Sequence, residues 1–491
     1  MRLPVNTAGQ ILQEQGTPSM AQHPLASLRA SLRLSHPAYA QLVAEVHAQL
    51  GYGQMAARRE KISRWESGRT VPELTAQLAM AHIHQVPGEE VERLGWPHWL
   101  YLSADHDALL FQPWTPQGAV DSLRSTARLD HVHRLPSLTL TGSALASTAR
   151  TSLSVLAGPQ APHARDGHRV SCDTVAWIES RTRELELHES GTSTAPAALY
   201  FAARAEHQLI TTLLTTGGYD RHTGTRLLLL AARTATLCAW LSSALGEEIA
   251  AERYALAAIR AATAAGARRH VATYMSQLSI RHLIAGDPQD ALSLVHAARA
   301  INQRPTAGLA ASLHTKEALA LARLGDTVGS ARALGRAADA LTADAAGHDP
   351  TIDPFDIKID GEYLAVAQGN AWLFLDQPKK ALPFFVTLLN DSTSPRTAAP
   401  ASPYTARRLL YVVDVQLALG ELDAAAHSAH RAIAITGTLP PGLADQYQRR
   451  FSSHRREPVA RDLLHRLADT APRPGNRPSR HMINELFQPG H

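Results

Sequence analysis

The chain has 491 residues, which at roughly 150 residues per domain predicts about three domains, or two if one is a repeat array. Its two cysteines, Cys172 and Cys238, exclude a disulfide framework or a cysteine-rich zinc site and are typical of a reducing compartment. The net charge of +4 permits an anionic partner without requiring one. The apolar residues are mainly the helix formers Ala and Leu, so the composition predicts an all-α fold.

Residues 1–22 are expected to form a mobile N-terminal arm. The beginning of the chain lacks the continuous apolar core of a signal peptide, so secretion is not indicated. The longest uncharged apolar stretch lies between Arg233 and Glu247, which is shorter than the roughly 20 residues that cross a bilayer. We therefore expect a cytoplasmic protein with no membrane partner.

The segment 23–102 carries short amphipathic patterns that predict a small domain of five helices. Proline can occupy the first turn of a helix and Ser35 is a suitable N-cap, while Gly51 and Gly68 can end helices in a left-handed conformation. The five helices are expected to begin at or near Pro24, Ser35, Ala57, Pro72 and Pro87.

Between residues 103 and 170 the helical pattern weakens, and proline, serine, threonine and glycine become frequent. This composition predicts a connector. Short helices are expected within it, near Gln117–Leu129 and Gly142–Leu156.

The segment 171–471 reads as an array of helix pairs, followed by a tail over residues 472–491. Turns recur at intervals of roughly 40 residues, and a small residue follows each turn, which would let two antiparallel helices approach closely. The turns begin at Gly246, Gly286, Gly325, Asp376 and Gly420, and the small residues are Ala251, Ala291, Ser330, Ala381 and Ala425. The longest interval predicts a loop insertion around residues 349–354. The pattern predicts an α-solenoid.

The stretch ARREKISRWESGR (Ala57–Arg69) is the most informative part of the chain. The stretch contains five cationic and two anionic side chains. The spacing of Ile62 and Trp65 predicts which side of the helix is buried. Helical spacing then places Arg59, Glu60 and Arg64 together on the outer face. An isolated basic face of this kind is more often only solvated, so its sequence context has to decide its role.

In that context, ISRWESGRTVPE resembles the helix-turn-helix of the Cro and λ-repressor-like (XRE) family. The resemblance implies that this third helix enters the DNA major groove. It makes Arg59, Glu60 and Arg64 candidate base readers. The remaining candidate DNA contacts are Arg58, Lys61, Ser63 and Arg69. The resemblance also implies a structural core made of Arg29, Leu42, Ile62, Trp65, Glu66 and Gly68, in which Glu66 pairs with Arg29 of the first helix.

Two features depart from the family pattern. His36 followed by Pro37 stands where the second helix usually begins with Gln, and the link around Gly51–Met55 is longer than in the simplest members. The contact at the start of the second helix and the angle of the third helix are therefore left open.

The later runs Gly217–Gly246, Leu283–Leu292 and Ala322–Asp326 resemble the tetratricopeptide-like region of actinobacterial, Streptomyces-type helix-turn-helix regulators. Some of those regulators act in development or secondary metabolism. The resemblance implies a repeat domain that mediates dimerisation or senses a peptide or small-molecule effector. Aromatic residues on the expected first helices of the pairs either line a groove or pack in the core, and core packing is the more common role. They are Trp240, Tyr274, Tyr363, Trp372 and Tyr411.

These features together predict a five-helix helix-turn-helix domain followed by a tetratricopeptide-like α-solenoid, acting as a sequence-specific transcriptional regulator. We expect a homodimer on double-stranded DNA with an inverted-repeat operator, because one such domain covers only a few base pairs. The alternative is a scaffold or adaptor whose solenoid binds a partner protein, with a helix-turn-helix that does not read DNA specifically.

Enzyme signatures are absent from the sequence: it has no phosphate-binding glycine loop, HExxH, GxSxG or GxGxxG. The pairs His82 with His84 and His131 with His133 have no third ligand near them, and i, i+2 residues diverge on a helix. We therefore expect no catalytic residues, no metal and no cofactor.

Overall fold

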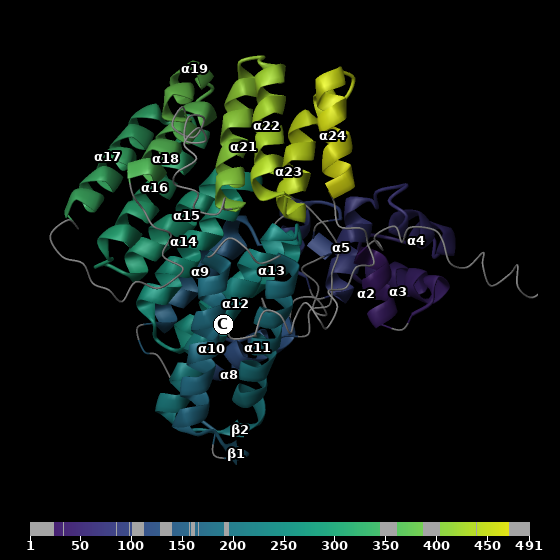
Figure 1. Ribbon diagram of the computed structural model, residues 1–491. Helices are drawn as coiled ribbons and strands as arrows, with labels where there is room; N and C mark the ends of the chain where they lie inside the picture. Colours follow the sequence, from purple (N-terminus) through teal and green to yellow (C-terminus); the bar gives the residue numbers. More distant parts are fainter. Residues whose placement is uncertain are drawn as a thin grey trace, which may run out of the picture. The chain divides into compact units, whose positions relative to one another are not determined.

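The computed structural model describes residues 24–32, 34–84, 86–97, 99–100, 112–127, 140–156, 158, 163–164, 166–190, 196–343, 361–385, 403–437 and 439–470. The chain divides into two units, Met1–Phe111 and Gln112–His491 (Figure 1). The expected arm over 1–22, the loop insertion around 349–354 and the tail over 472–491 lie outside the described residues.

The described part of the first unit contains five α-helices, the number that the sequence predicts. They are α2 (Pro24–Ser31), α3 (His36–Gln49), α4 (Arg59–Glu66), α5 (Leu74–Ile83) and α6 (Gly88–Leu94). Ser35 caps α3, since its hydroxyl accepts from the Ala38 amide at 3.4 Å. One apolar core joins the helices and includes Trp99 and Leu100, which have no exposed surface.

The described part of the second unit is also almost entirely helical. Its α-helices are α8 (Pro116–Ala127), α9 (Gly142–Val155), α10 (Cys172–Ser190), α11 (Pro196–Thr216), α12 (Arg221–Ala244), α13 (Glu248–Ala264), α14 (Arg268–Ala285), α15 (Pro288–Ile301), α16 (Ala307–Arg323), α17 (Thr327–Ala343), α18 (Gly361–Phe374), α19 (Pro378–Ala381), α21 (Pro403–Ala418), α22 (Leu422–Thr436), α23 (Pro441–Phe451) and α24 (Pro458–Thr470). Two 3₁₀ turns, η3 (Leu382–Phe385) and η4 (Ser452–His454), interrupt the C-terminal part. The strands β1 (His168–Arg169) and β2 (Gly217–Gly218) form one short parallel pair. The protein is therefore all-α in character, as its composition predicts.

The helix-pair turns lie where the sequence predicts them, and four of the five close in the same way. Gly246, Gly325 and Gly420 take φ values of 82°, 81° and 78°, and Asp376 takes 55°. In each, the amides of this residue and of the next bond back to carbonyls of the preceding helix's last turn. Gly286 differs, because it is extended and Asp287 caps the next helix.

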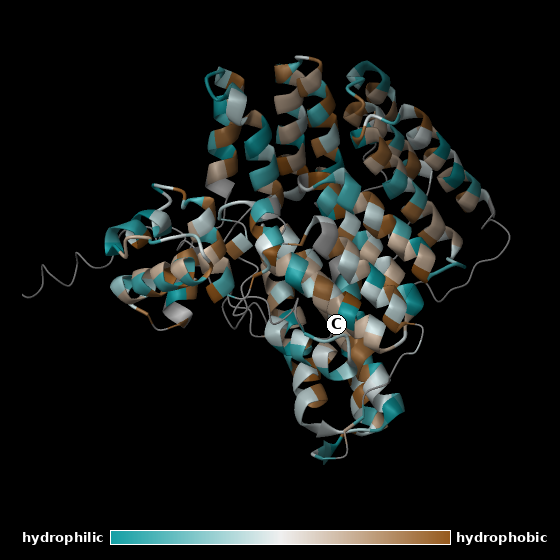
Figure 2. Ribbon diagram, turned by 180° about the vertical axis from the view of Figure 1, so that it is seen from behind, coloured by the Kyte–Doolittle hydropathy of each residue, from teal (hydrophilic) through white to brown (hydrophobic). Residues whose placement is uncertain are grey.

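Each small residue five positions after a turn is buried, as the pattern predicts. The exposed fraction is at most 1% for the set Ala251, Ala291, Ser330, Ala381 and Ala425. A small side chain at this point lets the second helix of a pair approach the first closely. Successive helices α11 to α17 accordingly pack side by side in an array (Figure 1). Figure 2 shows hydrophobic and hydrophilic residues mixed along the helices of the second unit.

The expectation of a connector over residues 103–170 is wrong for its two helices. Their bounds match the expected Gln117–Leu129 and Gly142–Leu156 closely, but α8 packs on α11 and α13, and α9 packs on α13 and α15. Both therefore belong to the second unit. The composition concealed this because small residues such as Ala119 and Ala149, and not only large apolar ones, form the buried faces.

Helix α12 is long and apolar enough, by length and composition alone, to cross a membrane. In this structure 72% of its most apolar window is buried inside the protein. Its composition is thus explained by its place among α10, α11, α13 and α23.

Candidate nucleic-acid interface

Helix α4 is anchored to the first unit by two apolar side chains. Ile62 and Trp65 are 1% and 6% exposed and lie in the core. The helix ends at Gly68, which takes φ 68°, and the amides of Gly68 and Arg69 bond to the carbonyls of Trp65 and Arg64. This closing motif fixes the backbone of Arg69 next to the last turn of α4.

The opposite side of α4 is exposed and basic. Arg59, Glu60 and Arg64 are all exposed, as helical spacing predicts. Arg59 and Glu60 approach to 3.8 Å, but their side chains are 72% and 65% exposed, so this surface pair contributes little and leaves both groups accessible to a ligand. Among the other candidate contacts, Lys61 is half-buried, whereas Arg58, Ser63 and Arg69 are exposed.

Glu66 ties α4 to two other helices. Its carboxylate accepts from Arg29 Nε at 2.6 Å and from Arg29 Nη2 at 3.3 Å, which is the pairing that the resemblance implies. The second carboxylate oxygen lies 2.7 Å from His36 Nε2 at the start of α3. Arg29 also donates to the Leu34 carbonyl at 2.7 Å. Because the Arg29 and Glu66 side chains are only 15% and 10% exposed, water competes weakly for these bonds.

The role of His36 is the main feature that sequence reasoning missed. Its position at the start of α3 identified it as a departure from the family pattern, but only the fold brings it to Glu66, 30 positions along the chain. His36 therefore faces inward to the ion pair, and its side chain is 39% exposed.

The long link between α3 and α4 is held by a histidine. His47 Nδ1 lies 2.9 Å from the Gly53 carbonyl oxygen, and the His47 and Tyr52 rings meet edge to face. Gly51 and Gly53 take φ values of 81° and 89°, a region that favours glycine, so both positions of the link suit this residue.

Buried polar groups behind α4 and α5 are matched with partners. Tyr39 lies in the core, against which the half-buried Leu42 also packs, and the Tyr39 hydroxyl is 2.7 Å from His84 Nε2. Burial raises the pKa of Tyr39 well above its ordinary value, so the phenol remains neutral. Trp99 donates to Gln77, which donates to the Pro72 carbonyl. These bonds orient the helices that support the exposed face of α4.

The aromatic residues that the sequence marks in the repeat region differ in burial. Tyr274 is buried at 1% exposure, and Trp372 and Tyr411 are partly buried and pack on the C-terminal core. These three residues therefore have the core-packing role that is the more common of the two expected from the sequence. Tyr363 is half-buried. Trp240 is 37% exposed, with the Arg407 guanidinium 5.1 Å from its ring centroid.

Within the described residues, no group of three or more His, Cys, Asp or Glu side chains is placed to hold a metal ion. His82 is exposed, whereas His84 is buried against Tyr39; the pair His131 with His133 lies outside the described residues. Comparisons of the chain with protein-family models, with curated proteins and with solved structures find no match.

Proposed function

We propose that the protein is a cytoplasmic, sequence-specific transcriptional regulator of the Cro and λ-repressor-like (XRE) kind. In this proposal the first unit is a helix-turn-helix DNA-binding domain. The second unit is a tetratricopeptide-like helical repeat that mediates dimerisation or senses an effector.

The observation that carries the proposal is the exposed basic face of α4, a helix whose opposite side is packed against the core of the first unit. Ile62 and Trp65 bury one side of α4, and Glu66 bonds it to Arg29 and His36. An α-helix is about 10–12 Å across and the major groove of B-DNA is about 12 Å wide, so an exposed helix of this kind can enter the groove.

The exposed side chains fall into two groups by reach and chemistry. Arg59 and Arg64, on the outer face of α4, suit bidentate bonding to guanine, and Glu60 between them suits cytosine N4. Arg58 and Arg69, at the two ends of the helix, suit phosphates on either side of the groove. Ser63 and the half-buried Lys61 complete the phosphate contacts.

The regulator would act as a homodimer on an inverted repeat. One helix of eight residues reads only a few base pairs, whereas two recognition helices about 34 Å apart on one face of the duplex give useful specificity. The helical array offers the larger surface for such an interface.

The test compares two kinds of arginine in the full-length protein. Genomic DNA fragments that the protein retains are isolated, and the bound site in each is mapped by footprinting. The affinity of the protein for these operator fragments is then measured by fluorescence anisotropy at several salt concentrations. Arg64→Ala should cost about 1–3 kcal/mol and relax the preference at one base pair. Arg69→Ala should weaken all sequences alike and reduce the salt slope by about one.

Arg332→Ala is the matched control, because Arg332 is an exposed arginine of the second unit. It should leave the DNA affinity unchanged. Equal, sequence-independent losses from Arg64→Ala and Arg69→Ala would reduce α4 to a nonspecific basic surface. If the protein retains no DNA fragment under any condition, the alternative role as an adaptor that binds a partner protein is favoured. If light scattering gives the mass of one protein chain per operator, the proposed homodimer is refuted.

A further inference from the structure

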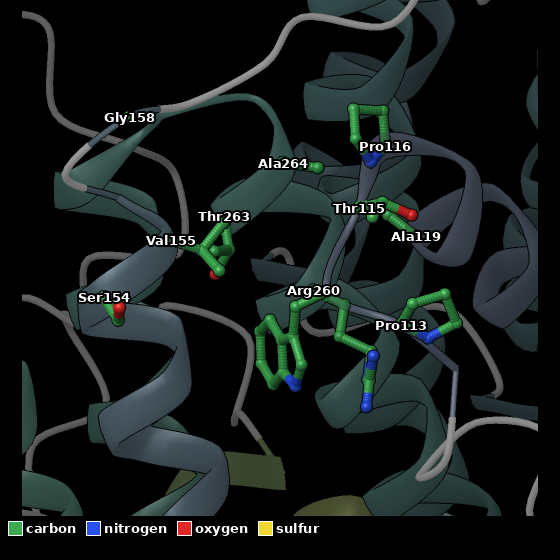
Figure 3. Close-up of a pocket in the computed structure, with 11 residues that line it drawn as sticks. Pro113, Thr115, Pro116, Ala119, Ser154, Val155, Gly158, Arg260, Thr263 and Ala264 are labelled. Atoms are coloured by element: carbon green, nitrogen blue, oxygen red, sulfur yellow. The ribbon is translucent and has the colours of Figure 1, made fainter.

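The second unit contains a cavity of about 390 Å³ that is partly open to solvent and lies near the beginning of α8, the end of α9 and the C-terminal half of α13 (Figure 3). Pockets that bind small organic ligands usually span about 300–1,000 Å³. All lining residues come from the second unit, so the inference does not rest on DNA binding by α4.

The walls of this cavity are fixed by long-range polar contacts. Thr263 of α13 donates to the Ile259 carbonyl at 2.7 Å, so Ser152 of α9 must be the donor in the 2.7 Å bond between their hydroxyls. Arg268 closes the end of α9 by donating to the Leu156 carbonyl at 2.8 Å. The cavity is therefore preformed, and a ligand would not need to order its walls.

Arg260 is the one charged side chain among the residues that line the cavity. It is 4% exposed, its guanidinium carbon lies 4.4 Å from the Trp114 ring centroid, and Nη1 donates to the Gln112 carbonyl at 2.8 Å. Figure 3 shows it extending from α13 towards Pro113. Burial lowers the pKa of Arg260 to about 10, so the group is still charged at neutral pH.

The remaining lining residues are apolar or weakly polar. Pro113, Trp114 and Pro116 line the cavity from the segment that leads into and begins α8, and Val155 and Ala264 line it from α9 and α13. Such a lining suits a small organic acid: its carboxylate would bond to the Arg260 guanidinium, and its flat apolar body would contact the prolines and the indole.

We propose that this cavity is a binding site for a small organic acid with a flat apolar body, whose carboxylate bonds to Arg260. If the protein regulates transcription, this site is where an effector of that class would bind.

The test measures binding of 1-naphthoate and its neutral analogue 1-naphthamide to the full-length protein by isothermal titration calorimetry, without DNA. Naphthoate should bind at least tenfold more tightly than naphthamide, because only the carboxylate forms a charge-assisted hydrogen bond with Arg260. Arg260→Met should weaken naphthoate binding to the level of naphthamide.

A second pair of variants keeps the test independent of any folding defect at Arg260. Ser154 and Ser147 are both exposed on α9, two turns apart, but only Ser154 lines the cavity. Ser154→Trp should fill the entrance and weaken naphthoate binding at least tenfold, whereas Ser147→Trp should leave it unchanged. Equal binding of the two probes, no effect of Ser154→Trp, or no naphthoate binding at about 1 mM would each overturn the proposal.

Discussion

The anchoring of α4 by Trp65 gives the sharpest test of the first unit. Trp65 is 6% exposed, and a buried aromatic side chain removes about 150–250 Å² from water. At about 25 cal/mol per Å², truncation to alanine would cost about 4–6 kcal/mol, and measured costs of such truncations are about 3–5 kcal/mol. We therefore expect Trp65→Ala to cost about 4 kcal/mol, a large share of the stability of a small domain.

The assay is hydrogen–deuterium exchange of the full-length protein, read on peptides that cover α2 and α4. A loss of about 4 kcal/mol corresponds to roughly a thousandfold faster exchange wherever unfolding of the first unit limits it. Two controls truncate exposed side chains: Leu74→Ala, at 47% exposure in the same unit, and Trp177→Ala, at 52% exposure in the second unit. Both should cost less than about 1 kcal/mol. Unchanged exchange of α4 in Trp65→Ala, or an equal loss in Leu74→Ala, would refute the reasoning.

Three further predictions concern polar and close-packed sites. Glu66→Gln should cost about 2 kcal/mol in urea unfolding, since it removes the charge that Arg29 faces, and Arg29→Met should add little in that background; additive losses would contradict the pairing. Burial lowers the pKa of His207 from 6.5 to about 4, so the folded state binds fewer protons than the unfolded state. The stability that comes from keeping His207 neutral is therefore fully present above pH 6.5 and is lost as the pH falls towards 4. Between pH 7 and pH 4 the wild type should lose about 3 kcal/mol more than His207→Gln, and parallel stability curves would show that His207 is not buried in the neutral form. Gly442→Ala should destabilise the protein in a thermal melt, because an added Cβ would lie 2.4 Å from the Ser243 carbonyl oxygen. Gly335→Ala is the control: the space around Gly335 is open, so this change should stabilise the protein by about 0.5–1 kcal/mol. The opposite order of stabilities would refute the close approach of α23 to α12.

Local sequence rules were sufficient for the turns and the small residues of the helix pairs. Gly246, Gly325 and Gly420 adopt the left-handed conformation that glycine tolerates best, and the next helix starts within three residues of each. Ala251 and Ala425, the fourth residues of α13 and α22, are fully buried because a helix that starts at such a turn directs this position to its partner. Such features depend on a few consecutive residues, so sequence alone could predict them.

Composition was a weaker guide for α8 and α9. The sequence indicated both helices but gave no sign of what they cover, because the bonds that hold them come from far along the chain. The Leu140 amide donates to Glu252, and the Gly142 amide donates to Asp290. A segment rich in proline and serine was therefore predicted as a connector although its helices cover α13.

At the candidate DNA interface the sequence by itself determined the exposed face of α4 and the buried positions Ile62 and Trp65, because helical periodicity is a local property. The pair of Glu66 with Arg29 came from a family resemblance. Only the tertiary structure decided that His36 joins this pair. In the second unit, likewise, only the tertiary structure decided that Arg260 lies against Trp114, 146 positions earlier in the chain. Contacts between residues so far apart are set by how the helices pack, and a single sequence carries no local signal for them.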